Sequence, residues 1–394
     1  MASDQEIWVF AITLLVFWLL VYWLSKVIHL EKYGFRINPF FIRYESQRFK
    51  AFLYKASEKR RIFWKIFSNL SIVVGSGLVI FAFFFLSENL SKFIISLISS
   101  LISGEVGGGG VGGGTPVVPI IPGVTLHLYW LPYLLLAIVI AAVMHEVSHG
   151  IVALVEGVNV KSAGAFFMAI FPGGFVEPNE EELEKSPTTS KLRIISAGST
   201  INVLSGVLAF LILSTIFIQT SSGIVIIDVS KDGPLERVGL RRWDVIYSLN
   251  GTAIRSIYDV AVFMVNVTPG EKLILGTSKG NISLNAACDP ADPKRAIIGI
   301  LSPALPYYPS RLGLGSFFDV QLYLSLNWMF IIFVNLAIFN MLPVPFFDGD
   351  KFIQYLFRRF TKEGNTIKKF LNGLSLFLII ANMVLSLRSG LFPF

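Results

Sequence analysis

The stretch LHLYWLPYLLLAIVIAAVMHEVSHGIVALV, residues 126–155, decides which class of fold this chain adopts. The run is almost entirely apolar, and it exceeds the roughly 20 residues that a helix needs to cross a hydrocarbon core of about 30 Å. It nevertheless contains His145, Glu146 and His149. An ionisable side chain inside a bilayer costs about 2.5–3.5 kcal/mol, so three of them within five residues indicate a functional site rather than helix packing.

The rest of the chain has the composition of a membrane protein. Of its 394 residues 54% are hydrophobic and only 15% charged, and the mean hydropathy of +0.66 is too high for a soluble globule. Six runs are long and apolar enough to span a bilayer: Ile7–Val27, Phe67–Leu86, Leu126–Val155, Leu192–Ile218, Leu322–Leu342 and Phe370–Leu387. We therefore predict a polytopic α-helical membrane protein with about six transmembrane helices. The shorter run Phe93–Ile102 is interrupted by serines, which favours an interfacial helix or a hairpin arm.

Lysine and arginine predict the orientation of these spans. They are concentrated between the first and second runs and again between the fifth and sixth, which places both loops in the cytoplasm and both termini outside. The net charge of +7 is therefore a membrane-facing signal and gives no support to nucleic-acid binding. We expect a multi-pass protein of the plasma membrane, with HEVSH toward the cytoplasmic side. Cys288, the single cysteine, excludes an internal disulfide and a thiolate zinc cluster.

Composition changes along the chain predict four parts. Gly107–Gly114 is a flexible tract in an external loop, and Phe166–Phe175 is a candidate re-entrant hairpin that turns at its Pro-Gly-Gly sequence. Between the fourth and fifth spans, IVIIDV, DVIYSLNG and KLILGT are strand-like runs separated by turn signals. The predicted parts are 1–65, the first transmembrane helix and a basic loop; 66–219, spans two to four; 220–310, a small β-rich domain outside the membrane; and 311–394, spans five and six.

The sequence HEVSH predicts a zinc site. Residues i and i+4 share one face of a helix, so His145 and His149 can bind one zinc ion while Glu146 stands beside it as general base. Zinc lowers the pKa of a bound water to about 7 and so makes hydroxide available at neutral pH. The bare pattern HExxH also occurs by chance, and its position inside a membrane span is what favours the zinc site.

A catalytic zinc of this class has three protein ligands, so one more is required. His29 lies in the predicted cytoplasmic loop, His127 lies at the far end of the span, and Glu156 is about 10 Å further along the helix than His149. None of the three can reach the ion. The missing ligand must therefore come from another span.

The sequence NMLPVPFFDG, Asn340–Gly349, offers a carboxylate from another span. Its two prolines break the end of the fifth span, and Asp348 follows on irregular backbone at the depth expected for HEVSH. Asp350, two residues on, is an alternative ligand. A carboxylate that merely lies at the membrane interface is the purely structural interpretation.

The two motifs together resemble those of the site-2 proteases, which are intramembrane zinc metalloproteases. HEVSH in a span followed by N-x-x-P-x-P-x-x-D-G carries the likeness, over about residues 117–350. The resemblance implies that His145, His149 and Asp348 bind zinc and that Glu146 is the general base. It also places Asn202, in AGSTIN at 197–202, beside the site as a catalytic residue, whereas pattern alone gives it a helix-packing hydrogen bond.

The β-rich segment is similar to PDZ domains. Gly233-Pro234, VGL at 238–240, WDVI at 243–246 and LNG at 249–251 follow the order seen in the PDZ domains of this family. Trp243 stands where glycine is common, and an obvious carboxylate-binding loop is missing, so capture of peptide tails is doubtful. A size filter over the site and a plain structural insertion are both open.

The predicted function is hydrolysis of peptide bonds in or near transmembrane segments by a zinc-activated water. The expected partners are single-span or other membrane-protein substrates and the lipid bilayer. The alternative is a catalytically inactive membrane scaffold that binds partners through the PDZ-like domain. An ion transporter would also place His and Asp in spans, but the sequence shows no duplicated or inverted halves.

Overall fold

The computed structural model describes residues 4–103, 113–301, 304–361 and 363–388. The chain forms two compact units, one of residues 1–207 and 329–394 and the other of residues 208–328. Most of the predicted glycine tract, residues 107–112, lies outside the described residues.

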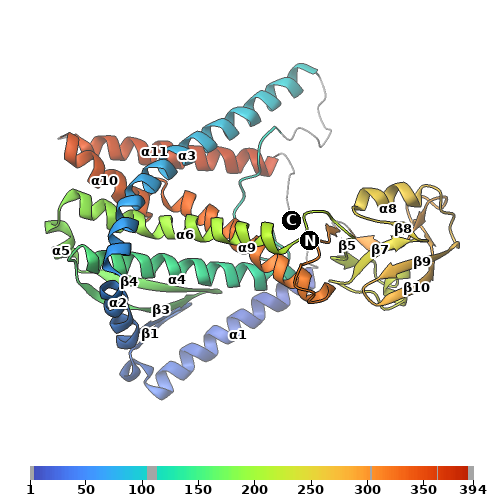
Figure 1. The fold of residues 1–394 in the computed structure, drawn as a ribbon, viewed down its shortest axis with the longest axis horizontal. Helices are drawn as coiled ribbons and strands as arrows, with labels where there is room; N and C mark the ends of the chain where they lie inside the picture. Colours follow the sequence, from blue (N-terminus) through green and yellow to red (C-terminus); the bar gives the residue numbers. More distant parts are fainter. Residues whose placement is uncertain (1–3, 104–112, 302–303, 362, 389–394) are drawn as a thin grey trace. The chain divides into compact units, whose positions relative to one another are not determined.

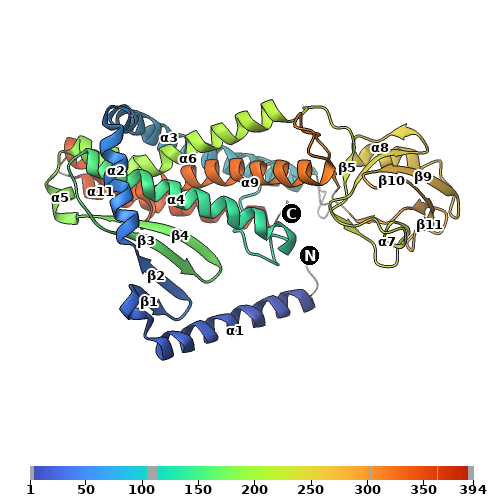
Figure 2. The same ribbon diagram turned by 60° about the horizontal axis from the view of Figure 1, so that its bottom comes forward.

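Six helices of the described chain are long and apolar enough to cross a membrane, which confirms the predicted number of spans. They are α1 (Asp4–Ile28), α3 (Arg61–Ser103), α4 (Leu131–Val155), α6 (Thr188–Ile216), α9 (Ser316–Asn340) and α11 (Gly364–Arg388). The shorter helices of the first unit are α2 (Gln47–Lys59), α5 (Glu180–Lys185) and α10 (Asp348–Phe360), with 3-10 turns η1 (Leu30–Tyr33) and η2 (Leu128–Trp130). Figures 1 and 2 both show α4 and α6 side by side.

Of the two structures predicted for Phe93–Ile102, the hairpin arm is wrong and the helix is present, joined to the preceding span; its interfacial position stays a prediction. These residues continue α3, which is 43 residues long. The serines do not interrupt the helix because their hydroxyls donate to carbonyls one turn earlier, Ser99 to Ile95 at 2.8 Å and Ser100 to Leu97 at 2.9 Å. A serine-rich apolar run can therefore extend a helix instead of ending it.

A four-stranded antiparallel sheet lies along α4 in the first unit (Figure 2). Its strands, in spatial order, are β1 (Phe35–Asn38), β2 (Phe41–Glu45), β3 (Val160–Met168) and β4 (Phe171–Pro178). The first two come from the loop after α1, which the sequence analysis left without structure. Because β4 ends the order, its outer edge has no strand partner in the described chain.

The predicted hairpin at Phe166–Phe175 is present, but the turn was predicted at the wrong residues. The chain turns at residues 169–170, where Ala169 has a φ of 52°, while Pro172 and Gly173 pair with Phe167 and Phe166 inside the sheet. A Cβ added at Gly173 would lie 2.5 Å from the Phe166 ring. The glycine therefore makes room for an aromatic ring and does not form the turn.

The long helix α1 is joined to the tip of this hairpin. Trp18 is only 3% exposed, and its indole N–H donates to the Ala169 carbonyl at 2.9 Å. Its ring stacks on Phe167, with centroids 5.7 Å apart. One tryptophan thus fixes a helix that otherwise exposes large apolar side chains such as Trp8 and Trp23.

The second unit contains the small strands of the chain and two short helices. The elements are β5 (Ile224–Val225), β6 (Asp228–Val229), α7 (Pro234–Arg237), β7 (Val245–Leu249), β8 (Thr252–Ala253), α8 (Ile257–Met264), β9 (Lys272–Thr277), β10 (Gly280–Asn285), β11 (Ala287–Cys288), β12 (Ala296–Ile297), β13 (Ile300–Leu301) and β14 (Leu305–Pro306). They enclose a core in which Ile226, Leu235 and Leu249 are fully buried. Trp243 has a φ of 76°, the left-handed region that favours glycine, so its departure from the PDZ pattern carries backbone strain. The PDZ likeness itself stays a prediction.

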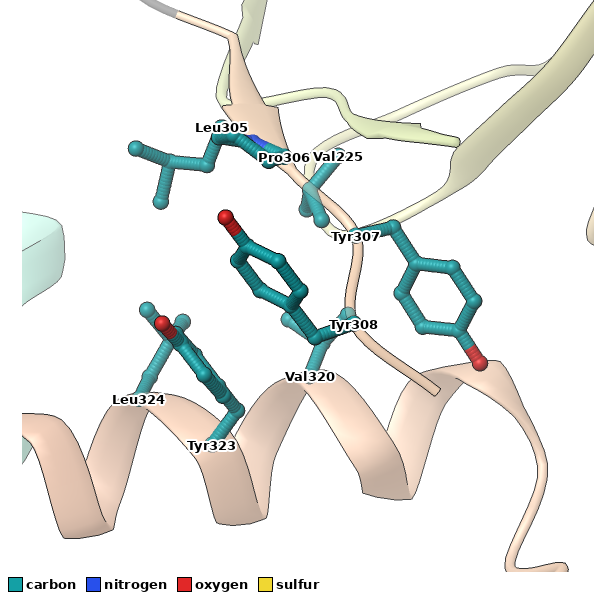
Figure 3. Close-up of a pocket in the computed structure, with 8 residues that line it drawn as sticks. All are labelled: Val225, Leu305, Pro306, Tyr307, Tyr308, Val320, Tyr323 and Leu324. Carbon is teal, nitrogen blue, oxygen red and sulfur yellow. The ribbon is translucent and has the colours of Figure 1, made fainter. Parts of the chain in front are cut away.

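Within this unit a tyrosine pair joins β14 to the first turns of α9. Tyr307 and Tyr308 point to opposite sides of the extended chain, and the Tyr308 ring closes a small pocket with Tyr323, the centroids being 5.1 Å apart (Figure 3). The Tyr307 hydroxyl donates to the buried Asp319 carboxylate at 2.9 Å, which also accepts the Ser310 N–H at 3.1 Å. Burial and this carboxylate raise the pKa of Tyr307 above its ordinary value.

Candidate active site

Two imidazoles of α4 meet the carboxylate at the start of α10. The His145 and His149 rings are four residues apart on one helix face, and their Nε2 atoms lie 3.0 Å from each other. The Oδ2 atom of Asp348 lies 3.0 Å from the His145 Nε2 and 3.1 Å from the His149 Nε2. In the part of the chain that the structure describes, these three residues are the one cluster of His, Cys, Asp or Glu that could hold a metal ion.

The donor set fits a zinc ion. Bonds of about 2.0–2.2 Å in tetrahedral geometry place ligand atoms about 3.3–3.6 Å apart. The separations of 3.0 and 3.1 Å in the cluster are a few tenths of an ångström shorter, which small side-chain rotations can correct. Two histidines and one carboxylate also leave the fourth position open for a water, as in catalytic zinc sites. Burial alone would raise the pKa of Asp348, but His149 and His145 outweigh it and hold that pKa below its ordinary value, so the carboxylate is anionic.

Helix α6 holds both imidazoles from behind. A metal-binding histidine needs an acceptor for its other ring N–H, and the His149 Nδ1 lies 2.6 Å from the Ile194 carbonyl. The His145 Nδ1 lies 3.4 Å from the Asn202 Nδ2, while the buried Asn202 Oδ1 has no hydrogen-bond partner. Turning this amide by 180° would offer the oxygen to the His145 ring. The structure thus places the Asn202 side chain against the His145 ring.

Sequence reasoning missed Asn340 as a site residue. Its Nδ2 donates to the Asp348 Oδ2 at 2.9 Å and lies 3.1 Å from the His145 Nε2. The available signal was its place at the head of the motif that ends in Asp348, before the two prolines fold the chain back. The following turn is strained, since the fully exposed Phe346 has a φ of 78°.

Gly198 of α6 is a second residue that sequence reasoning left without a role of its own. A Cβ added there would lie 2.5 Å from the His145 Nε2 and closer still to the His149 Nε2. The helix can approach the ligand atoms only because this position has no side chain. The signal was present as the small residues of AGSTIN.

We expect Gly198→Ala to lower zinc affinity by about 10–100-fold, the range measured when residues around ligands are changed. The new methyl group would push both imidazoles away from their positions. Zinc competition titration of the purified protein measures the effect. Gly77→Ala is the matched control, because a Cβ at this helical glycine meets nothing within 4 Å. Equal zinc affinity in both variants would contradict the expectation.

The remaining predicted residue, Glu146, faces the outer edge of the sheet. Its Oε2 accepts the backbone N–H of Val176 in β4 at 2.9 Å. Gly174 lies against the same helix, where an added Cβ would be 3.8 Å from the Glu146 Cβ. The candidate base thus stands between the histidine pair and an unpaired strand edge. Sequence reasoning could not find this contact because its donor is a backbone group.

Asp350, the alternative ligand of the sequence analysis, faces away from the histidines. It forms an ion pair with Lys368 at 2.8 Å and accepts the Asn372 Nδ2 at 2.8 Å, both from α11. On another side of α10, the Tyr355 hydroxyl donates to Glu184 at 2.8 Å. The Tyr355 hydroxyl and the Lys191 ammonium lower the pKa of Glu184 below its ordinary value. These contacts hold the helix that carries Asp348.

Six apolar helices with a His-His-Asp cluster beside a glutamate are the features of a membrane-embedded metallopeptidase. Comparison with known proteins assigns the family. The profile of Peptidase family M50 matches residues 133–382, which is more than half of the chain and includes every predicted site residue. The chain belongs to this family, whose members are membrane peptidases.

Two relatives are similar to parts of the chain. An uncharacterized protein of Methanocaldococcus jannaschii is 27% identical over 342 residues, covering 86% of this chain and 83% of that protein. The membrane-bound transcription factor site-2 protease homolog of Arabidopsis thaliana is 30% identical over 139 residues, 34% of this chain and 27% of the plant protein. The first likeness spans most of both chains, and the second is confined to a part.

Proposed function

We propose that the chain is an intramembrane zinc metalloprotease of the site-2 type that hydrolyses peptide bonds in or near the transmembrane segments of membrane proteins. The observation that carries the proposal is the convergence of His145, His149 and Asp348 within 3.1 Å, with Glu146 on the same helix. Membership of Peptidase family M50 supports it.

The residues of the site divide the chemistry among them. Zinc held by the three ligands would polarise the scissile carbonyl and lower the pKa of a water to about 7. Glu146 takes the proton of the attacking water and returns it to the leaving amine. The Ile194 carbonyl and Asn202 keep the two rings turned so that each Nε2 faces Asp348. Asn340 fixes the carboxylate through its bond of 2.9 Å.

The edge of β4 suits an extended substrate. A peptide bond inside an intact helix has its carbonyl engaged, so a substrate must unwind before it can be attacked. Once unwound in a membrane, its backbone needs new hydrogen-bond partners. We propose that the outer edge of β4 supplies them next to Glu146, through backbone groups other than the Val176 N–H, which Glu146 already accepts. Residues that weaken helices should therefore favour cleavage.

The placement of the site in the cell is part of the proposal. The concentration of lysine and arginine in the loops after the first and fifth spans favours a site that opens toward the cytoplasm, and we propose the plasma membrane as its location. The β-rich segment, with its PDZ-like sequence order, then lies outside. Single-span and other membrane proteins are the proposed substrates.

Metal removal tests the function. We expect the purified protein to hold about one zinc ion per chain and to cleave members of a panel of single-span substrates. Dialysis against a chelator should remove both the zinc and the activity, and added zinc should restore both. A catalytically inactive scaffold would bind partners through the second unit with or without metal. Cleavage that persists after complete removal of zinc would refute the proposal.

A further inference from the structure

Buried side-chain amides hold a short extended segment of the chain between α3 and α11. Asn89 of α3 is 3% exposed and Asn382 of α11 is fully buried. The Asn89 amide binds both backbone groups of Thr115, since it accepts the N–H at 2.6 Å and donates to the carbonyl at 2.8 Å. It also donates to the Asn382 Oδ1 at 2.9 Å. The Asn382 Nδ2 donates to the Leu86 carbonyl of α3 at 3.0 Å and to the Leu378 carbonyl at 2.8 Å, so Asn382 also joins the two helices. Asn89 is the amide that binds the segment itself.

A further bond extends this binding site for residues 115–117, here called the seat, along α11. The backbone N–H of Val117 donates to the Ser386 Oγ at 2.9 Å, and Ser386 donates to the Asn382 carbonyl at 2.7 Å. Every one of these bonds to the segment uses a backbone atom of Thr115 or Val117. These hydrogen bonds therefore recognise the extended backbone of the segment in the seat and not its side chains.

A series of packed contacts links the seat to the candidate active site. Val117 packs against the buried cluster that contains Leu86, Leu342 and Leu378. The Leu342 carbonyl in turn lies against Gly349, where an added Cβ would overlap it. Gly349 directly follows Asp348. In Figure 1 the chain that follows the grey trace after α3 passes α11 on its way to α4.

We propose that the seat formed by Asn89 and Ser386, with Asn382 bonded to both, is a binding site for extended polypeptide, filled at rest by Thr115–Val117 and taken over by the unwound segment of a membrane-protein substrate. The proposal rests on the proposed protease function and adds a route by which substrate reaches that site. The backbone of an unwound apolar segment needs hydrogen-bond partners inside a membrane, and the seat offers three such bonds. Because the seat binds only backbone atoms, substrates of different sequence can compete for the seat.

A proline substitution at residue 115 weakens the binding of the resident segment without changing the residues of the seat. Thr115→Pro removes the N–H that donates to Asn89 but leaves Asn89, Asn382 and Ser386 unchanged, whereas Thr115→Ala keeps the N–H. One hydrogen bond fewer should lower the KM for membrane substrates by about 3–10-fold in Thr115→Pro and leave Thr115→Ala like the wild type. Steady-state cleavage of a single-span substrate measures the difference. Equal KM values for the two variants would overturn the proposal.

A disulfide that keeps the resident segment in the seat tests the same exchange, because the substrate should then be unable to replace the segment. In a Cys288→Ser background, Ser96→Cys and Gly113→Cys place two thiols together, because a Cβ at residue 113 lies 2.8 Å from the Ser96 Cβ. A disulfide needs about 3.5–4.5 Å between these atoms, so an outward shift of about 1 Å suffices. Oxidation should lower cleavage by the double variant at least tenfold relative to its reduced form, and a reductant should restore it. A Cβ at residue 113 also lies 2.6 Å from the Lys92 carbonyl oxygen, so each single-cysteine variant is compared with its own reduced form, and oxidation should not change its rate. An oxidised protein that cleaves at the reduced rate would overturn the proposal.

A labelling experiment separates this inference from the proposed chemistry. In a Glu146→Gln, Cys288→Ser background, Val117→Cys supplies one thiol in the seat. Maleimide labelling of this thiol should become faster when an uncleaved single-span substrate is added. If the wild type hydrolyses nothing and labelling still accelerates, the protease function fails and the seat exchange stands. If the wild type cleaves but labelling does not change, the exchange is refuted and the protease function stands.

Discussion

Replacing Glu146 by glutamine is expected to lower kcat by about 10²–10⁴-fold while zinc stays bound, the range that general base catalysis contributes. The amide has the shape of the carboxylate but cannot take a proton from water. Its oxygen can still accept the Val176 N–H, which the Glu146 Oε2 accepts at 2.9 Å in the native protein, so the sheet keeps its place. The metal ligands are untouched. Hydrolysis should therefore be lost without loss of fold or metal.

Zinc content by mass spectrometry and single-turnover cleavage of a single-span substrate measure the two parts of this expectation. Glu88→Gln is the matched control, since Glu88 is a half-exposed glutamate of α3 that pairs with Lys92 far from the histidines in sequence. It should behave like the wild type. A Glu146→Gln protein that cleaves at an unchanged rate would show that another group is the base.

Asp348→Ala is expected to lower zinc affinity by more than the roughly 10–100-fold that changes around a ligand cause, and to abolish cleavage. The substitution removes the oxygen that lies 3.0 and 3.1 Å from the two imidazoles. It leaves His145 and His149 as a pair of ligands from one helix. Two ligands on one face do not fix a catalytic zinc ion.

Asp350→Asn is the control for this prediction. Asp350 sits two residues away on the same helix, and the amide loses the ion pair with Lys368 but still accepts from Asn372. Its zinc affinity should stay within about tenfold of the wild type, because only the seating of α10 is weakened. Isothermal titration with zinc ranks the variants. If Asp350→Asn loses as much affinity as Asp348→Ala, the third ligand has been misassigned.

Membrane architecture was predictable from the sequence because it depends on local composition. Runs of apolar residues identify spans without knowledge of their neighbours, and the number of six is confirmed. The errors arose where a long-range contact decides a local structure. Gly173 looked like a turn residue, yet the Phe166 ring that requires it lies across the hairpin. The serines near Phe93 looked like a break, yet their hydroxyls bond within the helix.

The candidate site was predictable where spacing within one element determines geometry. His145 and His149 follow from the helical repeat, whereas the prolines that end the fifth span left Asp348 and Asp350 as alternatives, and the resemblance to the site-2 proteases favoured Asp348. The structure brings these three side chains together and turns Asp350 elsewhere. Gly198 and the Ile194 carbonyl could not be assigned in this way, because α6 reaches the imidazoles only through tertiary packing. Backbone donors such as the Val176 N–H carry no signature in a residue pattern.

The open side of β4 bears on how the isolated protein behaves. A strand that lacks a neighbour is a template for any other extended chain, including the same strand of a second molecule. Two molecules each carry one such edge. In concentrated detergent solution they are free to meet, and two molecules joined in this way would cover each other's Glu146. Specific activity that declines as the enzyme is concentrated would then reflect mutual blockage rather than damage.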